Sequence, residues 1–101
     1  MIDKPIDSLP NLGPATRRRL EEVGIATEAE LLRLGAVEAY RRLKFRDPKR
    51  VSLNALYALE AAIRNTHWLH LPKEVKAALK VEAGAIDEAL RRAVASRGDA
   101  R

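Results

Sequence analysis

Apolar residues recur along most of the chain at intervals of three or four, which is the spacing of one face of an α-helix. The most apolar stretch runs from Leu53 to Ile63, where only Asn54 and Glu60 are not apolar. A helix of this composition is expected to be central and packed on several sides. Sustained alternation of apolar and polar residues, the mark of strands, is missing from the sequence. The pattern therefore predicts an all-α fold, a compact domain of five or six helices.

Residues typical of helix ends divide the chain into these helices. Pro14 suits the first turn of a helix, and Gly24 suits the end of one. Thr27 and Glu30 have capping-box spacing, in which each side chain accepts a hydrogen bond from a free backbone N–H. Ser52 is a natural N-cap for the apolar helix. We expect helices over residues 14–23, from 28 to the glycine at 35, from 36 to the break at 46–50, over 53–65, and from 72 onward.

The C-terminal segment, about residues 80–97, is predicted to be a separately amphipathic helix. Gly84 marks either a kink or a break between two helices. The apolar stripe either folds back over the core, which benefits a domain of this size, or offers an apolar surface to another molecule. The stripe consists of Ile86, Ala89, Leu90, Ala93 and Val94.

Composition limits the possible functions. With 101 residues, the chain is expected to form a single domain over 1–101 with its core at about 6–79. Cysteine is absent from the sequence, which excludes disulfides and thiolate chemistry. The N-terminus lacks signal-peptide features and the apolar stretch is too short to span a bilayer, so we expect a cytoplasmic protein without a membrane partner. A formal net charge of +5 favours polyanionic partners.

The turn that leads into the first helix is a candidate phosphate site. Gly13 allows close approach of a ligand to the backbone, and the free N–H groups of the first helical turn favour an anion. Arginines one turn further on would add positive charge. The structural alternative is a helix corner that binds nothing. The candidate phosphate-binding residues are Asn11, Leu12, Gly13, Thr16, Arg17 and Arg18.

A second basic group lies at the end of the third predicted helix and in the loop after it. Its members are Arg41, Arg42, Lys44, Arg46, Lys49 and Arg50, offset within that window only by Asp47. Such a group either tracks a nucleic-acid backbone or forms an ordinary solvated face. Tyr40 and Phe45 lack the spacing of a base-stacking platform, and we expect both to anchor the helix to the core.

The residues after the apolar helix give no sign of catalysis. His67 and His70 are three residues apart, but two histidines without a cysteine or carboxylate nearby do not predict a metal site. Trp68 is expected to close the core, and Glu60 either to pair with Arg64 one turn on or to accept a hydrogen bond from a backbone N–H of a neighbouring helix. Because phosphate-loop, dinucleotide and nucleophile motifs are also missing, we expect no enzyme activity and no cofactor.

Several segments together resemble a known family. They are Leu9-Pro-Asn-Leu-Gly-Pro14, Val23-Gly-Ile25, Leu34-Gly-Ala-Val-Glu-Ala-Tyr40-Arg-Arg-Leu43, Ser52-Leu-Asn-Ala-Leu-Tyr-Ala-Leu-Glu60, and His67-Trp68 followed by Leu71-Pro72. Over about residues 6–79 the chain is similar to the C-terminal domain of the TfoX (Sxy) family, bacterial regulators of competence for DNA transformation. The resemblance implies a small all-helical fold with a helix-hairpin-helix-like element and no enzyme activity. The Gly-hydrophobic-Gly turn of DNA-binding hairpins appears here as Asn11-Leu12-Gly13.

Two functions remain open at this point. The resemblance implies a non-enzymatic module of transcription regulation that contacts the backbone of double-stranded DNA through the Gly13 turn. The alternative is a protein-interaction adaptor without direct DNA contact. Such an adaptor would recognise a transcription component, or a second copy of the chain through the C-terminal helix.

Overall fold

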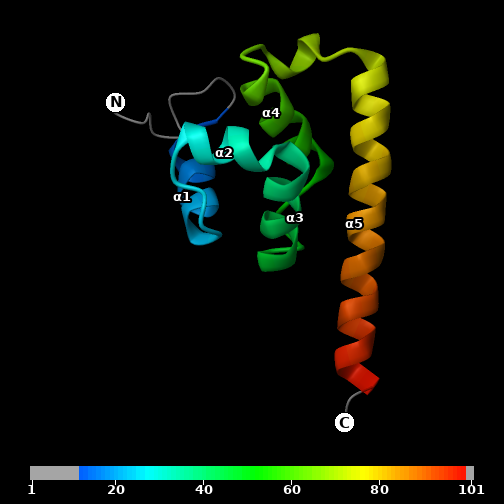
Figure 1. Cartoon of the computed structure of the whole chain (residues 1–101). Coiled ribbons are helices and arrows are strands. Elements are labelled where there is room, and N and C mark those ends of the chain that lie inside the picture. The colour runs from blue at the N-terminus through cyan, green and yellow to red at the C-terminus, as the bar shows by residue number, and fades with distance from the viewer. Residues whose placement is uncertain (1–11, 100–101) are drawn as a thin grey trace.

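Five α-helices and one 3-10 turn make up the regular structure of residues 12–99. The structure, a computed structural model, describes the backbone of residues 12–99 and the side chains of residues 12–95. Over the described residues every regular element is helical, which confirms the predicted all-α fold (Figure 1). The elements are α1 (Pro14–Glu22), α2 (Glu28–Leu34), α3 (Ala36–Arg46), α4 (Leu53–Ile63), the 3-10 turn η2 (Trp68–His70) and α5 (Lys73–Asp99).

The centre of the domain is shared between two helices. The helix α3 packs against α1, α2, α4 and α5, whereas α4, the helix that the sequence places at the centre, packs against α3, α5 and η2. Leu56 and Leu59 of α4 are buried, as are Ala39 and Tyr40 of α3. The helix α3 therefore packs against more helices than the more apolar α4 does.

The end of α1 is held by a Schellman motif. Gly24 has φ +84°, the left-handed conformation that glycine adopts without steric cost. Its N–H donates to the carbonyl of Glu21 at 3.1 Å, and the N–H of Ile25 donates to the carbonyl of Leu20 at 2.9 Å. Leu20 and Ile25 are both fully buried. The motif therefore closes the helix and fixes α1 to the core with one pair of apolar side chains.

The predicted cap of α2 is confirmed, and that of α4 is confirmed in its position alone. The N–H of Glu30 donates to the Thr27 hydroxyl at 3.3 Å, and the Glu30 carboxylate accepts from the N–H of Ala26 at 3.5 Å. Gly35, with φ +85°, ends α2 and directly precedes α3. Ser52 occupies the N-cap position of α4, although its hydroxyl makes no capping hydrogen bond.

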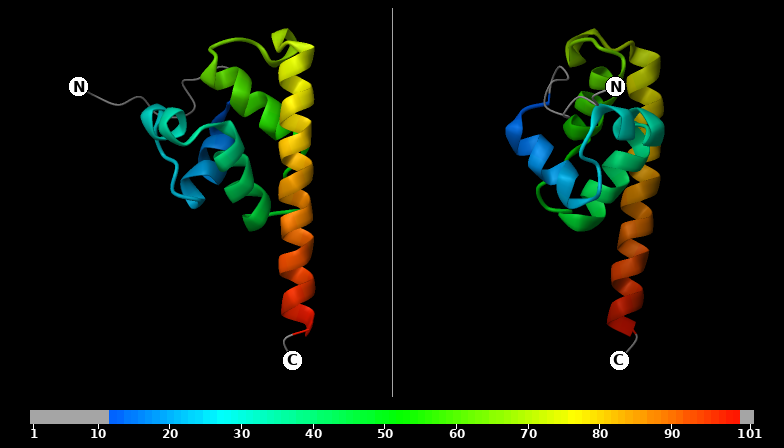
Figure 2. Two further views of the ribbon diagram at one scale, coloured as in Figure 1. Left: turned by 45° about the vertical axis from the view of Figure 1, so that its right-hand side comes forward. Right: turned by 60° about the vertical axis from the view of Figure 1, so that its left-hand side comes forward.

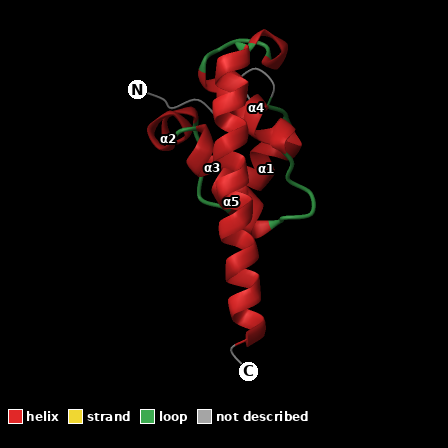
Figure 3. Ribbon diagram, turned by 90° about the vertical axis from the view of Figure 1, so that its right-hand side faces the viewer, coloured by secondary structure: helices red, strands yellow, loops and turns green. Residues whose placement is uncertain are grey.

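The C-terminal part of the chain differs from expectation because α5 is one continuous helix through Gly84. Leu79, Ala83 and Ile86 are buried against the core. Beyond Ile86 the helix leaves the body, and its lower half has no other helix beside it (Figures 2 and 3). Val94 is 57% exposed. The apolar stripe therefore folds back only as far as Ile86, and the break considered at Gly84 is wrong.

The aromatic residues divide between core and surface. Tyr40 is 1% exposed, as expected for a core anchor. Phe45, at 39%, and Trp68, at 38%, are exposed, so the expectation that they pack in the core is wrong. Phe45 lies five residues after Tyr40, which places it on another side of α3. Its ring lies 5.8 Å from the guanidinium of Arg41.

Candidate nucleic-acid interface

The start of α1 forms an open corner. Leu12 is 5% exposed and anchors the turn in the core, while Gly13, Pro14 and Ala15 are exposed. Asn11, the first of the candidate phosphate-binding residues, lies outside the described residues. The first turn of α1 contains no acidic side chain, and no group of the chain accepts a hydrogen bond from the N–H of Ala15 in the part that is described. The corner can therefore donate hydrogen bonds to an anion.

Glycine at position 13 is not required by the backbone. Gly13 is the N-cap of α1 with φ −107° and ψ −174°, an extended conformation that any residue adopts. A Cβ built at Gly13 meets no atom within 4 Å. The glycine therefore leaves free space in front of the helix instead of relieving strain.

The three arginines of α1 are in different environments. The Nε of Arg17 lies 2.8 Å from Glu21 Oε1, so its charge is already engaged within the helix. Arg18 is exposed beside a shallow hollow of about 270 Å³ that it lines together with Pro14, Arg17 and Glu21. Neither Arg18 nor Arg19 has an ion pair or side-chain hydrogen bond with any described residue. These two arginines are available to an external anion. Thr16, the remaining candidate, is half-buried.

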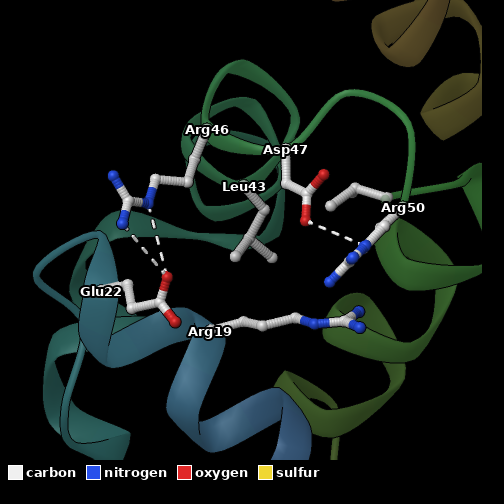
Figure 4. A pocket seen from close by; sticks show the side chains of 7 residues that line it. Arg19, Glu22, Leu43, Arg46, Asp47 and Arg50 are labelled. Atoms are coloured by element: carbon white, nitrogen blue, oxygen red, sulfur yellow. Dashed lines mark hydrogen bonds and ion pairs between the residues drawn. The ribbon is translucent and has the colours of Figure 1, made fainter.

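Arg19 borders a notch between α1, the end of α3 and the connection to α4. The notch has a volume of about 290 Å³. In Figure 4 the Arg19 side chain extends across it toward Arg50. Arg46 Nη2 lies 3.4 Å from Glu22 Oε2, and Arg50 Nε lies 3.9 Å from Asp47 Oδ2. Three guanidinium groups thus face two carboxylates. The sequence did not associate Arg19 with the second basic group, because Arg46 lies 27 positions after Arg19.

At the middle of α3 two arginines of the second basic group share one carboxylate. Glu38 accepts from Arg41 and from Arg42, each pair at 2.8 Å. These hydrogen bonds lower the pKa of Glu38 to about 2 and raise the pKa of Arg41. Arg42 also donates to the carbonyl of Val23 at 3.2 Å and so ties α3 to the turn after α1. Both arginines support the fold.

The rest of the second basic group is dispersed. Lys44 Nζ donates to the carbonyl of Val51 at 2.6 Å and lies 4.0 Å from Asp87 Oδ1. Lys49 is exposed and has no ion pair with the residues that the structure describes. Asp47 is the one acidic residue within this stretch of sequence, and Glu22, Glu38 and Asp87 also offset the group from outside it.

Comparison with known proteins identifies the family. A family model described as the TfoX C-terminal domain matches residues 2–83. This chain belongs to the TfoX C-terminal domain family. The match confirms the resemblance over the body of the domain, and it ends at Ala83 of α5, which is buried against the core.

Solved structures with this TfoX C-terminal fold are similar to most of the chain. A crystal structure of an uncharacterized protein from Listeria monocytogenes, in a triclinic form, is 36% identical with a TM-score of 0.72, covering 75% of this chain and 85% of that one. A protein of unknown function from the same organism, in a tetragonal form, is 34% identical with a TM-score of 0.75, covering 79% and 98% respectively. No functionally curated protein matches the chain.

The residues after α4 in this TfoX C-terminal domain have structural partners. His67 Nδ1 accepts from the N–H of Leu69 at 3.2 Å, and its ring lies 6.0 Å from that of His70. Among residues 12–99 there is no group of three or more potential metal ligands. The predicted Glu60–Arg64 ion pair is confirmed at 2.6 Å. No helix in this range is long and apolar enough to cross a membrane.

Proposed function

We propose that this TfoX C-terminal domain is a non-enzymatic, cytoplasmic regulatory module that holds the backbone of duplex DNA at the α1 corner. The observation that carries the proposal is the combination of an open helix start with two arginines, Arg18 and Arg19, that no described carboxylate neutralises. The family supports a role as a competence-regulator-like domain.

The chemistry of the corner suits a phosphate group. The exposed N–H groups of the first turn and the positive end of the α1 dipole favour a single negative charge. Arg18, beside the first turn of α1, and Arg19, at the notch, supply charge-assisted hydrogen bonds to neighbouring phosphates. Contacts of this kind fix the position of a protein on DNA without reading sequence.

A salt titration of duplex-DNA binding tests the proposal. We expect Arg18→Glu to weaken binding about tenfold at low salt and to reduce the slope of log affinity against log salt by about 0.9, the value for one phosphate contact. Gly13→Val should also weaken binding, because a side chain would occupy the free space in front of α1 without straining the backbone.

Arg33→Glu is the matched control. Arg33 is an exposed arginine of α2 without an ion pair to any residue in the described range, and its reversal changes the net charge equally. If Arg18→Glu and Arg33→Glu lowered DNA affinity equally, the overall charge of the chain would explain the effect, which would contradict the proposal. Absence of binding at low salt would also contradict it.

A second candidate, a protein-interaction adaptor, is favoured by the projecting half of α5. Its apolar stripe continues from the buried Ile86 to the half-buried Leu90 and the exposed Val94. Because this stripe is continuous with the face that α5 presents to its own core, its chemistry suits a second copy of the chain. A concentration-dependent dimer in light scattering, lost in Val94→Asp, would support the adaptor. A monomer at all concentrations would exclude self-association.

A further inference from the structure

A second cavity lies on the other side of Val51 from the arginine notch. It has a volume of about 510 Å³ and is bounded by α3, the connection from α3 to α4, and α5. Val51 lines both hollows, so the connection separates them. A volume of this size falls within the range of roughly 300 to 1,000 Å³ that is common for small-molecule sites.

Three lysines from three different elements border this cavity, against one carboxylate. Lys44 comes from α3 and is engaged, because its Nζ donates to the carbonyl of Val51 and lies near Asp87. Lys49 of the connection and Lys80 of α5 are exposed. Neither has an ion pair within the described part of the chain. The cavity therefore carries an excess of positive charge that is not compensated internally, which favours an anionic ligand.

Two polar groups in the wall of the cavity lack hydrogen-bond partners. The Tyr40 side chain is 1% exposed, and its hydroxyl makes no hydrogen bond with any residue that the structure describes. Asp87 Oδ1 is buried and also has no hydrogen-bond partner. Burial and the charge of Asp87 raise the pKa of Tyr40, so the hydroxyl keeps its proton and is a donor. Of the two, Asp87 Oδ1 is the fully buried atom, with Lys44 Nζ 4.0 Å away, and buried polar atoms in proteins normally have a hydrogen-bond partner.

We infer that this cavity binds a small phosphate ester that carries a hydroxyl group, of the class of sugar phosphates and nucleotides. Lys49 and Lys80 hold the phosphate, and the Ser52 hydroxyl, which makes no capping hydrogen bond, lines the same cavity. The hydroxyl of the ester donates to Asp87 Oδ1 and accepts from Tyr40. This inference is independent of the proposed DNA contact, because an internal phosphate of DNA has no neighbouring free hydroxyl.

Titration of the full chain with ribose 5-phosphate, followed by proton–nitrogen correlation spectra, tests the inference. We expect saturable shifts centred on the residues of the cavity, with an affinity about tenfold higher than for inorganic phosphate, because the hydroxyl contacts add to the charge contacts. Ribose alone should produce no saturable shift. An ester that binds no more tightly than inorganic phosphate, or an absence of saturable shifts, would overturn the inference.

Variants of Lys80 and Tyr40 separate the role of the lysines from that of the Tyr40 hydroxyl in the cavity wall. Lys80→Gln should weaken ester binding about tenfold, whereas Lys73→Gln, an exposed lysine of the same helix that does not line the cavity, should have no effect. Tyr40→Phe keeps the buried ring and should lower ester affinity, because one of the two hydroxyl contacts is lost, while leaving phosphate affinity unchanged. Equal effects of the two lysine variants, or an unaltered ester affinity in Tyr40→Phe, would overturn it.

A DNA-binding assay shows whether a negative result contradicts the inference about the cavity or the proposed DNA contact. Because Lys80 lies on α5, away from the α1 corner, Lys80→Gln should leave duplex-DNA affinity within about twofold of the unmodified chain. A variant that loses ester binding and retains DNA binding shows that the cavity acts independently of the α1 corner. Loss of DNA binding in Arg18→Glu with retained ester binding shows that the α1 corner acts independently of the cavity.

Discussion

The basic runs of α1 and α3 look alike in sequence and differ in their surroundings. Each places adjacent arginines on a short helix with glutamates within one turn. On α3 both Arg41 and Arg42 are bound by Glu38. On α1 only Arg17 is paired within the helix. The number of arginines in a run therefore says little about how much charge remains for a ligand.

Competition for a single carboxylate accounts for part of this difference. Glu22 stands four residues after Arg18, the spacing that favours an ion pair within a helix. In the structure Glu22 instead lies 3.4 Å from Arg46, 24 residues further along the chain. The tertiary contact leaves Arg18 without its local partner. A residue on α3 thus contributes to the charge that α1 presents.

The largest expected effect is on folding stability. Arg42→Met should lower the free energy of unfolding by about 1 to 2 kcal/mol, because it removes the ion pair with Glu38 and the hydrogen bond to Val23. Arg18→Met should leave stability unchanged. Urea denaturation of both variants makes the comparison. Equal stability of the two would contradict the structural role assigned to Arg42.

A smaller effect concerns the pH dependence of stability. The pKa of Glu38 is about 2 in the folded chain and near 4.5 without its partners, so its stabilising contribution is complete above pH 4.5 and is lost as pH falls toward 2. Glu38→Gln should remove about 1 kcal/mol at neutral pH, allowing for solvent screening, and flatten stability over this window. Denaturation curves recorded between pH 2 and 7 measure how the free energy of unfolding depends on pH in both chains. An unchanged pH profile would contradict the pairing.

The smallest expected effect is on DNA affinity. Glu22→Gln should raise duplex-DNA affinity about threefold at low salt, because it removes a negative charge beside two unpaired arginines and releases Arg46. Glu28→Gln on α2 is the control with the same charge change. Fluorescence anisotropy with a labelled duplex gives both values. An equal rise in the control would show that only net charge matters.

Local signals in the sequence were sufficient for most helix boundaries. The positive φ of Gly24 and Gly35, and the cap made by Thr27 and Glu30, all satisfy backbone groups within a few residues. The length of α5 was missed because Gly84 costs only about 1 kcal/mol relative to alanine within a helix, and packing against the core outweighs it. Whether a helix continues through a glycine is therefore decided by packing against residues that are distant in the sequence.

The site was less accessible from the sequence than the fold. The open start of α1 was predicted from Pro14 and Gly13, since helix ends expose their own N–H groups. The ion pairs that offset the second basic group were not predicted, because Glu22 and Asp87 reach it from other helices. Likewise, the aromatic character of Phe45 and Trp68 suggested burial, whereas only their position in three dimensions shows that they face solvent.

The exposed position of Trp68 has a practical consequence for spectroscopy. It is the sole indole of the chain, and it stands on η2 next to the imidazole of His67, with ring centroids 6.0 Å apart. Its emission in the native protein should already be red-shifted toward that of a hydrated fluorophore. Intrinsic fluorescence will therefore report the melting of the helical core only weakly.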